Sequence, residues 1–242
     1  MKFYSLSTRN LKEIYRDPVT ILLGLAMPLG FLLLFASIEK KIPLEIYTAQ
    51  NLTPGVTIFS FAFIIMFSAT LLAKDKQSAF LIRLFATPLK PSDYILSYLL
   101  PFIPFALLQI VVCFVTGILF GASFQNILIS MLLFLFIAIS CISLGMILGA
   151  LFTVNQVSGV GSVLITAIGL FSGVWMDLKM VGGVFETIGY ALPFAHAVDA
   201  SRGLLSGSHF DSISHSFYIV ILYSIVLFFL AILAFRRAMR KT

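Results

Sequence analysis

Six long apolar stretches, separated by shorter polar segments, follow one another along this chain of 242 residues. A helix needs about 20 apolar residues to cross a bilayer, and backbone inside hydrocarbon must satisfy its own hydrogen bonds. The pattern therefore predicts an all-α, polytopic membrane protein with a single transmembrane domain over residues 1–242. The six spans are predicted at residues 19–38, 52–73, 95–120, 127–151, 157–176 and 217–235.

The segment before the first span, residues 1–17, has an amphipathic helical pattern. Its apolar positions fall on one side of a helix, and its basic positions, including Arg9 and Arg16, fall on another. This pattern predicts an interfacial elbow helix that lies in the headgroup layer. Asp17 followed by Pro18 predicts the start of the next helix, because aspartate can cap a helix and proline at its first position loses no hydrogen bond.

The stretch 178–207 is apolar enough to suggest a seventh span, but glycines, Pro193 and several charged residues interrupt it. We expect two short helices instead, at 184–191 and 194–205, that dip into the outer leaflet and return. Irregular backbone is tolerated at that depth when protein or water surrounds it. The prediction is a re-entrant outer hairpin before the last span.

The distribution of charge predicts the orientation in the membrane. Only 11% of the residues are charged, against about 25% in soluble domains. The sixteen Lys and Arg residues gather at the borders of the apolar stretches, which favours contact with membrane lipid and argues against a nucleic-acid partner. Twelve of them lie in the N-terminal segment, the loop 74–93 and the C-terminal tail. We therefore expect a multi-pass protein of the bacterial plasma membrane with both termini in the cytoplasm.

Motifs for chemistry are missing from the sequence. It contains no GxxxxGK[ST] phosphate loop and no CxxC or HExxH metal spacing. We expect this chain to have no catalytic residues and to bind no metal and no cofactor itself. If ATP drives its work, ATP and Mg²⁺ must be held by a partner subunit. The scarcity of polar residues inside the spans argues against an ion channel or a proton-coupled carrier.

The loop 74–93, between the second and third spans, contains a short amphipathic helix pattern. Phe80 with Leu84, and Leu81 with Phe85, are spaced i, i+4 and form an apolar ridge. One interpretation is a helix that only anchors the loop at the membrane surface. The other is a rigid docking element for a cytoplasmic partner. Two prolines that follow the pattern favour rigidity, which a simple tether would not need.

Aromatic residues form a candidate substrate pathway. Phe59, Phe63 and Phe67 in the second span lie on one helical stripe, and Phe171 and Trp175 in the fifth span have the same spacing. The plainer interpretation is bulk for helix packing or lipid contact. Aromatic stripes that face a subunit interface would suit a hydrophobic or amphiphilic substrate, because such rings bind apolar matter without fixed geometry.

Three of the four charged residues in the predicted outer hairpin are candidates for a role. Asp199 and Arg202 are spaced i, i+3, so we expect a structural ion pair, since an unpaired charge near lipid is costly. Glu186 needs a partner or water in this apolar surrounding, and it is a further candidate for the pathway.

At four places the sequence resembles the membrane subunits of type-2 ABC exporters, six-span permeases that work with a separate ATPase. The similar segments are Arg9 with Tyr15-Arg16-Asp17-Pro18, the Arg83-Leu84-Phe85-Ala86-Thr87-Pro88-Leu89 run, Ser172-Gly173, and 192–203 with its Pro193, Ala197, Asp199 and Arg202. Two features differ from the family pattern. Lys74 stands where an acidic residue is common, and Met176-Asp177 and Gly182-Gly183 stand where prolines are common after the fifth span.

The resemblance implies a permease subunit of an ATP-driven exporter, with a second copy or a paralogous permease as partner and an ABC ATPase docked on the cytoplasmic side. It implies that loop 74–93 is a coupling helix, with the elbow helix beside it. The cargo would be a drug, an antimicrobial peptide or a lipid. The docking residues expected on this basis are Gln77, Phe80, Leu81, Arg83, Leu84, Phe85, Arg9 and Arg16.

Two other functions remain open from the sequence. The chain can instead be a sensor or immunity module that works with an ATPase without transporting anything. An intramembrane enzyme is a further alternative, which the lack of paired catalytic groups in the spans disfavours.

Overall fold

The computed structural model describes residues 2–41, 45–78 and 91–240, and every regular element in these ranges is helical. Six of the described helices are long and apolar enough to cross a membrane. They are α2 (Pro18–Glu39), α3 (Ala49–Gln77), α5 (Pro91–Leu119), α6 (Ile127–Leu151), α7 (Val154–Phe171) and α11 (Phe210–Arg240). The shorter elements are α1 (Lys2–Arg16), η1 (Glu45–Tyr47), α8 (Leu178–Val181), α9 (Gly183–Ala191) and α10 (Pro193–Leu205). The all-α fold with six spans is confirmed.

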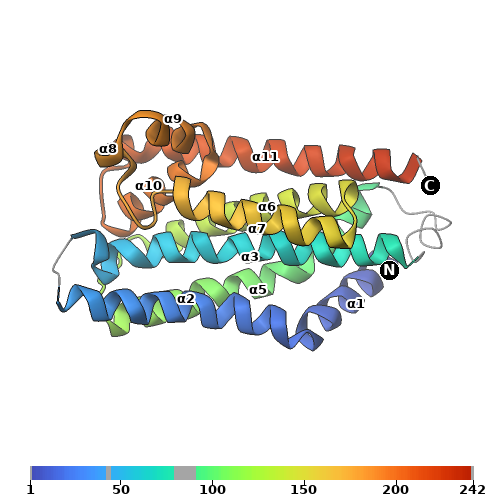
Figure 1. The fold of residues 1–242 in the computed structure, drawn as a ribbon, viewed down its shortest axis with the longest axis horizontal. Helices are drawn as coiled ribbons and strands as arrows, with labels where there is room; N and C mark the ends of the chain where they lie inside the picture. The colour runs from blue at the N-terminus through green and yellow to red at the C-terminus, as the bar shows by residue number, and fades with distance from the viewer. Residues whose placement is uncertain (1, 42–44, 79–90, 241–242) are drawn as a thin grey trace.

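The six long helices form one bundle with both chain termini at the same end (Figure 1). We call this the termini end; α8, α9 and α10 occupy the opposite end, the hairpin end. An even number of spans requires this placement of the termini. The cytoplasmic orientation of the termini end stays a prediction.

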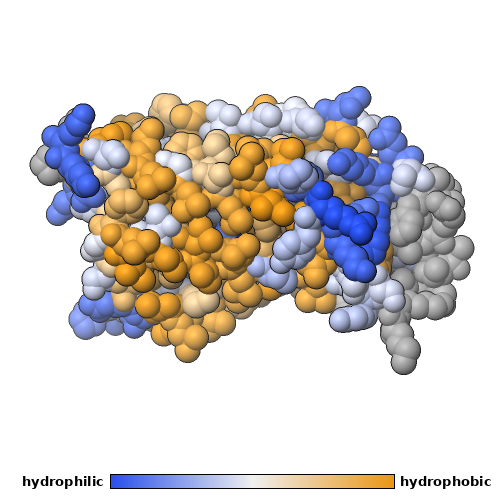
Figure 2. Space-filling view, turned by 90° about the horizontal axis from the view of Figure 1, so that it is seen from below, coloured by the Kyte–Doolittle hydropathy of each residue, from blue (hydrophilic) through white to orange (hydrophobic). Residues whose placement is uncertain are grey.

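A hydrophobic belt surrounds the bundle. Figure 2 shows apolar side chains across the middle of the molecule and hydrophilic side chains gathered toward both ends. Large apolar residues such as Leu33 of α2, Val111 of α5 and Phe229 of α11 are exposed in this belt. Exposed apolar surface of this extent is expected where lipid is the solvent, so the chain is a multi-pass membrane protein.

Helix α3 is the central element of the bundle, since it packs against α2, α5, α6, α7 and α10. Most of its residues are buried. Its hydroxyl side chains are satisfied inside the helix: Thr53, Thr57 and Ser68 each donate to the carbonyl four residues earlier, at 2.7 Å. Burying a polar side chain in an apolar interior is unfavourable unless it has such a hydrogen-bond partner.

Glycines bring α6 directly onto α3. A Cβ atom at Gly145 would collide with the Ser68 hydroxyl and the Ile65 carbonyl, and one at Gly149 would lie 2.6 Å from the Ala69 carbonyl. Small residues four apart allow membrane helices to approach closely. The GxxxG spacing of Gly145 and Gly149 is the sequence signal for this contact.

Two interhelical hydrogen bonds join further spans. Gln109 of α5 donates to the Gly24 carbonyl of α2 at 2.7 Å, and the hydroxyls of Ser140 in α6 and Ser224 in α11 lie 2.6 Å apart. Hydrogen bonds of this kind contribute about 0.6–2 kcal/mol each between membrane helices.

The hairpin end contains the two short helices predicted at 184–191 and 194–205, observed as α9 and α10, and a further short helix, α8. Helix α10 begins at Pro193, whose ring is compatible with a first helical position. The structure confirms the helices, and their re-entry into the outer leaflet stays a prediction.

The glycine contact leads to a first prediction. We expect Gly145→Ala to lower the midpoint of thermal unfolding in detergent, because the added methyl group meets α3 backbone, at a cost of about 1–3 kcal/mol. Gly30→Ala is the matched control, since a Cβ there meets nothing within 4 Å. Equal midpoints for the two variants would contradict this packing.

Candidate functional site

An ion-pair cluster fastens α1 to the bundle at the termini end. Arg9 of α1 binds the carboxylate of Asp75 in α3 with both terminal nitrogens, at 2.6 and 2.7 Å. The second of these nitrogens also donates to Glu13, one turn further along α1, at 2.6 Å. Tyr98 of α5 donates its hydroxyl to Asp75 at 2.5 Å. We call Arg9, Glu13, Asp75 and Tyr98 the elbow clamp.

Burial makes the elbow clamp obligatory. The Asp75 side chain is only 4% exposed, whereas that of Arg9 is 33% exposed. A buried carboxylate without a partner is strongly unfavourable, so α3 can bury Asp75 only because α1 and α5 supply donors. A two-point guanidinium–carboxylate contact also fixes the angle between the helices.

The charges of the elbow clamp act on each other. Burial lowers the pKa of Arg9, but the hydrogen bond and the charge of Asp75 outweigh it, so that the pKa is raised. Burial raises the pKa of Glu13; Arg9 lowers it and Asp75 raises it, and the net shift is upward. Two carboxylates therefore share one guanidinium.

The elbow clamp joins the helices on either side of residues 79–90. Asp75 lies in the last turn of α3, before this loop, and Tyr98 lies in α5, shortly after it. Asn10 of α1 adds a hydrogen bond to the Ser97 carbonyl at 3.2 Å. Helix α1 thus joins α3 and α5, the helices that precede and follow residues 79–90.

A neighbouring lysine joins the same end of α3 to the turn between α6 and α7. The Lys76 ammonium donates to the carbonyls of Ala150 and Phe152, each at 2.9 Å. These carbonyls lie at the C-terminal end of α6, where backbone acceptors lack helical partners and a cation is favoured. The last turn of α3 is therefore fixed on two sides.

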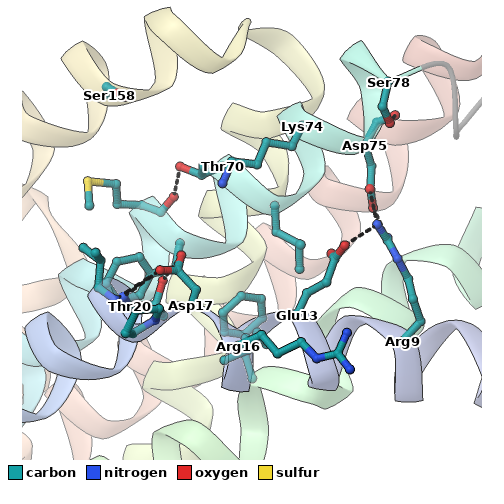
Figure 3. A pocket seen from close by; sticks show the side chains of 17 residues that line it. Arg9, Glu13, Arg16, Asp17, Thr20, Thr70, Lys74, Asp75, Ser78 and Ser158 are labelled. Atoms are coloured by element: carbon teal, nitrogen blue, oxygen red, sulfur yellow. Dashed lines mark hydrogen bonds and ion pairs between the residues drawn. The ribbon is translucent and has the colours of Figure 1, made fainter.

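A cavity of about 840 Å³ opens beside the elbow clamp (Figure 3). Its walls come from α1, the start of α2, the second half of α3, Phe102 of α5 and Ser158 of α7. Asp17 stands at the corner between α1 and α2 and accepts from the backbone N–H groups of Val19 and Thr20, at 3.1 and 3.4 Å. This confirms the predicted helix start at Pro18.

The structure describes three of the eight predicted docking residues. Gln77 is the last residue of α3 and is exposed, and Arg16 is the last residue of α1. Arg9 is engaged in the elbow clamp. The rest of the predicted docking set lies outside the described residues: Phe80, Leu81, Arg83, Leu84 and Phe85.

The three phenylalanines that the predicted pathway takes from the second span are buried inside the chain. Phe59, Phe63 and Phe67 follow one side of α3 and are 6–8% exposed. Phe59 contacts Phe31 of α2 with a ring-centroid distance of 5.6 Å, and Phe67 contacts Phe105 of α5 at 6.5 Å. They form the inner wall between α2, α3 and α5.

Trp175 and Phe171 do not share a helical stripe, which corrects the prediction. Helix α7 ends at Phe171, earlier than the predicted residue 176, so Trp175 lies beyond it. Trp175 packs against Phe31, Phe35 and Phe59, with centroid distances of 4.9, 5.1 and 5.4 Å. Phe171 instead stacks on Phe185 of α9 at 5.4 Å.

Arg202 acts as a latch at the hairpin end. It donates to the Asn51 carbonyl of α3 at 2.9 Å and to the carbonyls of Gly173 and Val174, just after α7, at 3.1 Å each. Burial lowers the pKa of Arg202 by more than the charge of Asp199 raises it, so the pKa lies below its ordinary value. This side chain therefore joins α10 to the start of α3 and to the segment that follows α7.

The predicted ion pair between Asp199 and Arg202 is therefore wrong as a direct contact. Asp199 accepts a hydrogen bond from the Tyr190 hydroxyl at 2.7 Å, while Arg202 is taken up by backbone carbonyls. The i, i+3 spacing predicts only that Asp199 and Arg202 share a helix face. The Arg202 guanidinium instead donates to backbone carbonyls near the start of α3 and just after α7. Glu186 lies partly exposed in the first turn of α9.

The sequence pattern does not predict Asp75, Tyr98 and Lys76 as interacting residues. Asp75 stands between two lysines, which suggests local pairing, whereas its partner Arg9 lies 66 residues away. One signal was available: Asp75 lies at the end of an apolar span, where a charge close to lipid requires a partner.

The elbow clamp leads to a second prediction. Removing one partner of a buried ion pair costs about 3–5 kcal/mol, so we expect Arg9→Gln and Asp75→Asn each to lower the free energy of unfolding, measured in mixed micelles, by about 3 kcal/mol. The double variant should lose less than the sum, with a coupling of about 0.5–3 kcal/mol. Arg16→Gln is the control on the same helix. A coupling near zero would refute the contact.

The Arg202 latch leads to a third prediction. Arg202→Lys keeps the charge but loses the planar fork that reaches three carbonyls, so we expect faster amide hydrogen exchange at the hairpin end and a loss of about 1–3 kcal/mol. Asp199→Asn should leave exchange near Gly173 unchanged. A strong energetic coupling between Asp199 and Arg202 in a double-mutant cycle would instead restore the direct ion pair.

Comparison with known proteins places this fold in a family. Residues 1–206 match the profile of the family described as ABC-2 type transporter. The chain is 24% identical over 210 residues to the putative transport permease YvfS of Bacillus subtilis, covering 83% of this chain and 84% of that protein. It is 29% identical over 195 residues to ABC transporter G family member 20 of Dictyostelium discoideum, covering 76% of this chain but 26% of that protein. The chain therefore belongs to the ABC-2 type transporter family, whose members are the membrane permease subunits of transporters.

Proposed function

We propose that this chain is the membrane-spanning half of an ATP-driven exporter. Two copies, or this chain and a paralogous permease, form the transmembrane unit. Each copy docks one ABC ATPase on the cytoplasmic side and moves a hydrophobic or amphiphilic cargo out of the cell. Family membership supports a transport role, and the lack of a phosphate loop in the sequence supports a separate subunit for ATP.

The observation that carries the proposal is the frame that α1 forms with the two helices before and after residues 79–90, which belong to the predicted docking loop 74–93. Arg9, Asn10, Asp75 and Tyr98 join α1 to α3 about one turn before residue 79 and to α5 about two turns after residue 90. A loop that only connects two spans does not need such a frame. A loop that receives force from a partner needs such a frame. If the helices on either side of it could move freely, the movement would not be transmitted to the spans.

Force applied at this loop has a direct route into the bundle. Helix α3 directly precedes this part of the chain and packs against both α6 and α7. Lys76 joins the same end of α3 to the turn between those two helices. Closely packed elements shift as units, since interiors have little free volume. Movement at the loop therefore displaces α3, α6 and α7 together.

The exposed face of α7 is the surface along which we place the cargo and the second copy. Asn155, Ser158, Ser162 and Thr166 are exposed on this span, and the three hydroxyls donate to carbonyls of their own helix. This face is more polar than a lipid-facing surface needs to be. The aromatic wall of Phe59, Phe63 and Phe67 lies behind it, on α3.

Purification with an ABC ATPase tests the proposal, and an ATPase encoded by a neighbouring gene is the first candidate. We expect the complex to show cargo-stimulated ATP hydrolysis and ATP-dependent uptake of an amphiphilic dye into inside-out vesicles. The double variant Arg83→Glu/Leu84→Asp should reduce the stimulation at least tenfold, because it reverses charge and apolarity in the docking loop. Hydrolysis by the isolated ATPase should not change.

Lys179→Glu is the control, because it reverses one positive charge at the hairpin end, as Arg83→Glu does in the predicted docking loop. Unchanged coupling in the Arg83→Glu/Leu84→Asp variant would contradict the docking assignment. An ATPase complex that forms but moves no cargo would favour the sensor or immunity module. Activity without any ATPase would favour an intramembrane enzyme.

A further inference from the structure

The cavity beside the elbow clamp changes in polarity along α3. Its α3 wall runs from Met66 to Ser78, which is about 18 Å at the helical rise of 1.5 Å per residue. Met66, Phe67 and Leu71 line the part toward the bundle centre, whereas Lys74 and Asp75 line the part toward the termini end. The cavity therefore has an apolar half at membrane depth and a charged half at the membrane surface, as an amphiphile has.

Its volume suits one molecule of that kind. About 840 Å³ lies within the range of about 300–1,000 Å³ found for small-molecule sites. Phe102 of α5 closes the apolar half and is 1% exposed, so that part of the wall is firmly packed. The α1–α2 corner at Asp17 adds a polar part to the wall (Figure 3).

The unused hydrogen-bonding capacity of the cavity consists mostly of donors. Each of its carboxylates already accepts hydrogen bonds: Asp75 from Arg9 and Tyr98, Glu13 from Arg9, and Asp17 from the first turn of α2. Lys74 and Arg16 have no hydrogen-bond or ion-pair partner among the described residues. In Figure 3 the Lys74 side chain points toward the space above Asp17 and away from Arg9.

The formal charges of the cavity cancel, and what favours a ligand with a negative charge at Lys74 is which of the charged groups are already engaged. The cavity has three basic and three acidic side chains, but one guanidinium and two carboxylates are combined in the elbow clamp, and Asp17 is held by the helix start. A cationic head would compete with Arg9 for carboxylates that are already occupied. An anionic head meets the three free donors of Lys74 and, at the rim, Arg16.

We propose that this cavity binds an amphiphile with an anionic head, a phosphate or a carboxylate, drawn from the cytoplasmic leaflet. The head lies at Lys74, with Arg16 at the rim, and the apolar tail follows Met66, Phe67 and Leu71 toward the bundle centre. Only the assignment to the cytoplasmic leaflet rests on the proposed function. The binding itself requires no ATPase and no second copy.

Titration of the full chain in a neutral detergent with lipids of equal chain length tests this site. Native mass spectrometry would follow binding of phosphatidylglycerol, which is anionic, and of phosphatidylcholine, which is zwitterionic. We expect phosphatidylglycerol to bind at least tenfold more tightly, and Lys74→Gln to remove most of this preference. Lys74 is exposed, so the variant should fold.

Lys12→Gln is the matched control, since it removes the same charge from α1 outside this cavity. It should change the affinity for phosphatidylglycerol less than twofold. Thr70→Phe is a second variant, which fills the cavity without changing its charge and should also weaken binding. Equal affinity of the native chain for the two lipids, or equal losses in Lys74→Gln and Lys12→Gln, would overturn the site.

Reconstitution with the ATPase then separates two sources of the bound amphiphile. ATP-dependent movement of fluorescent phosphatidylglycerol across vesicles, lost in Lys74→Gln, would support the site as a cargo site. Stimulation of hydrolysis without movement would support it as a site for a resident membrane lipid. If binding holds while no ATPase couples to the chain, the proposed function fails and the site stands.

Discussion

The architecture of the termini end depends on the neutralisation of one buried carboxylate. Asp75 lies at the end of the most buried helix, where water cannot solvate its charge. Arg9 supplies the countercharge and Tyr98 an additional donor, so α1 and α5 must both approach α3. The position of α1 follows from this requirement, because a buried charge tolerates little displacement of its partner.

The same arrangement produces the cavity. Helix α1 turns into α2 at Asp17 and Pro18, and the clamp fixes the distance between this corner and the last turns of α3. Arg9, Glu13 and Asp75 therefore belong both to the clamp and to the cavity wall. On the proposed function, a ligand at Lys74 would lie next to the contacts that hold the docking loop. Ligand binding and ATPase docking would then act on one set of residues.

At the hairpin end, the groups that need partners are backbone carbonyls, and an arginine side chain supplies the hydrogen bonds. The backbone is irregular after α7, and its carbonyls at Gly173 and Val174 have no helical continuation. Arg202 satisfies both and adds the Asn51 carbonyl at the start of α3. Helix α3 is thus held near one end by a carboxylate–guanidinium pair and near the other by guanidinium–carbonyl bonds. Both contacts involve an arginine whose fork spans more than one acceptor.

The sequence by itself determined the number of spans, the helix start at Pro18, the broken segment before the last span and the resemblance to the permease family. These are local properties, since hydropathy, capping and proline act within a few residues. Only the tertiary structure decided the partners of the charges. Arg9 meets Asp75 across 66 residues, and Arg202 prefers distant carbonyls to Asp199 nearby. Buried charges take the partners that packing brings to them, and a one-dimensional pattern does not contain that geometry.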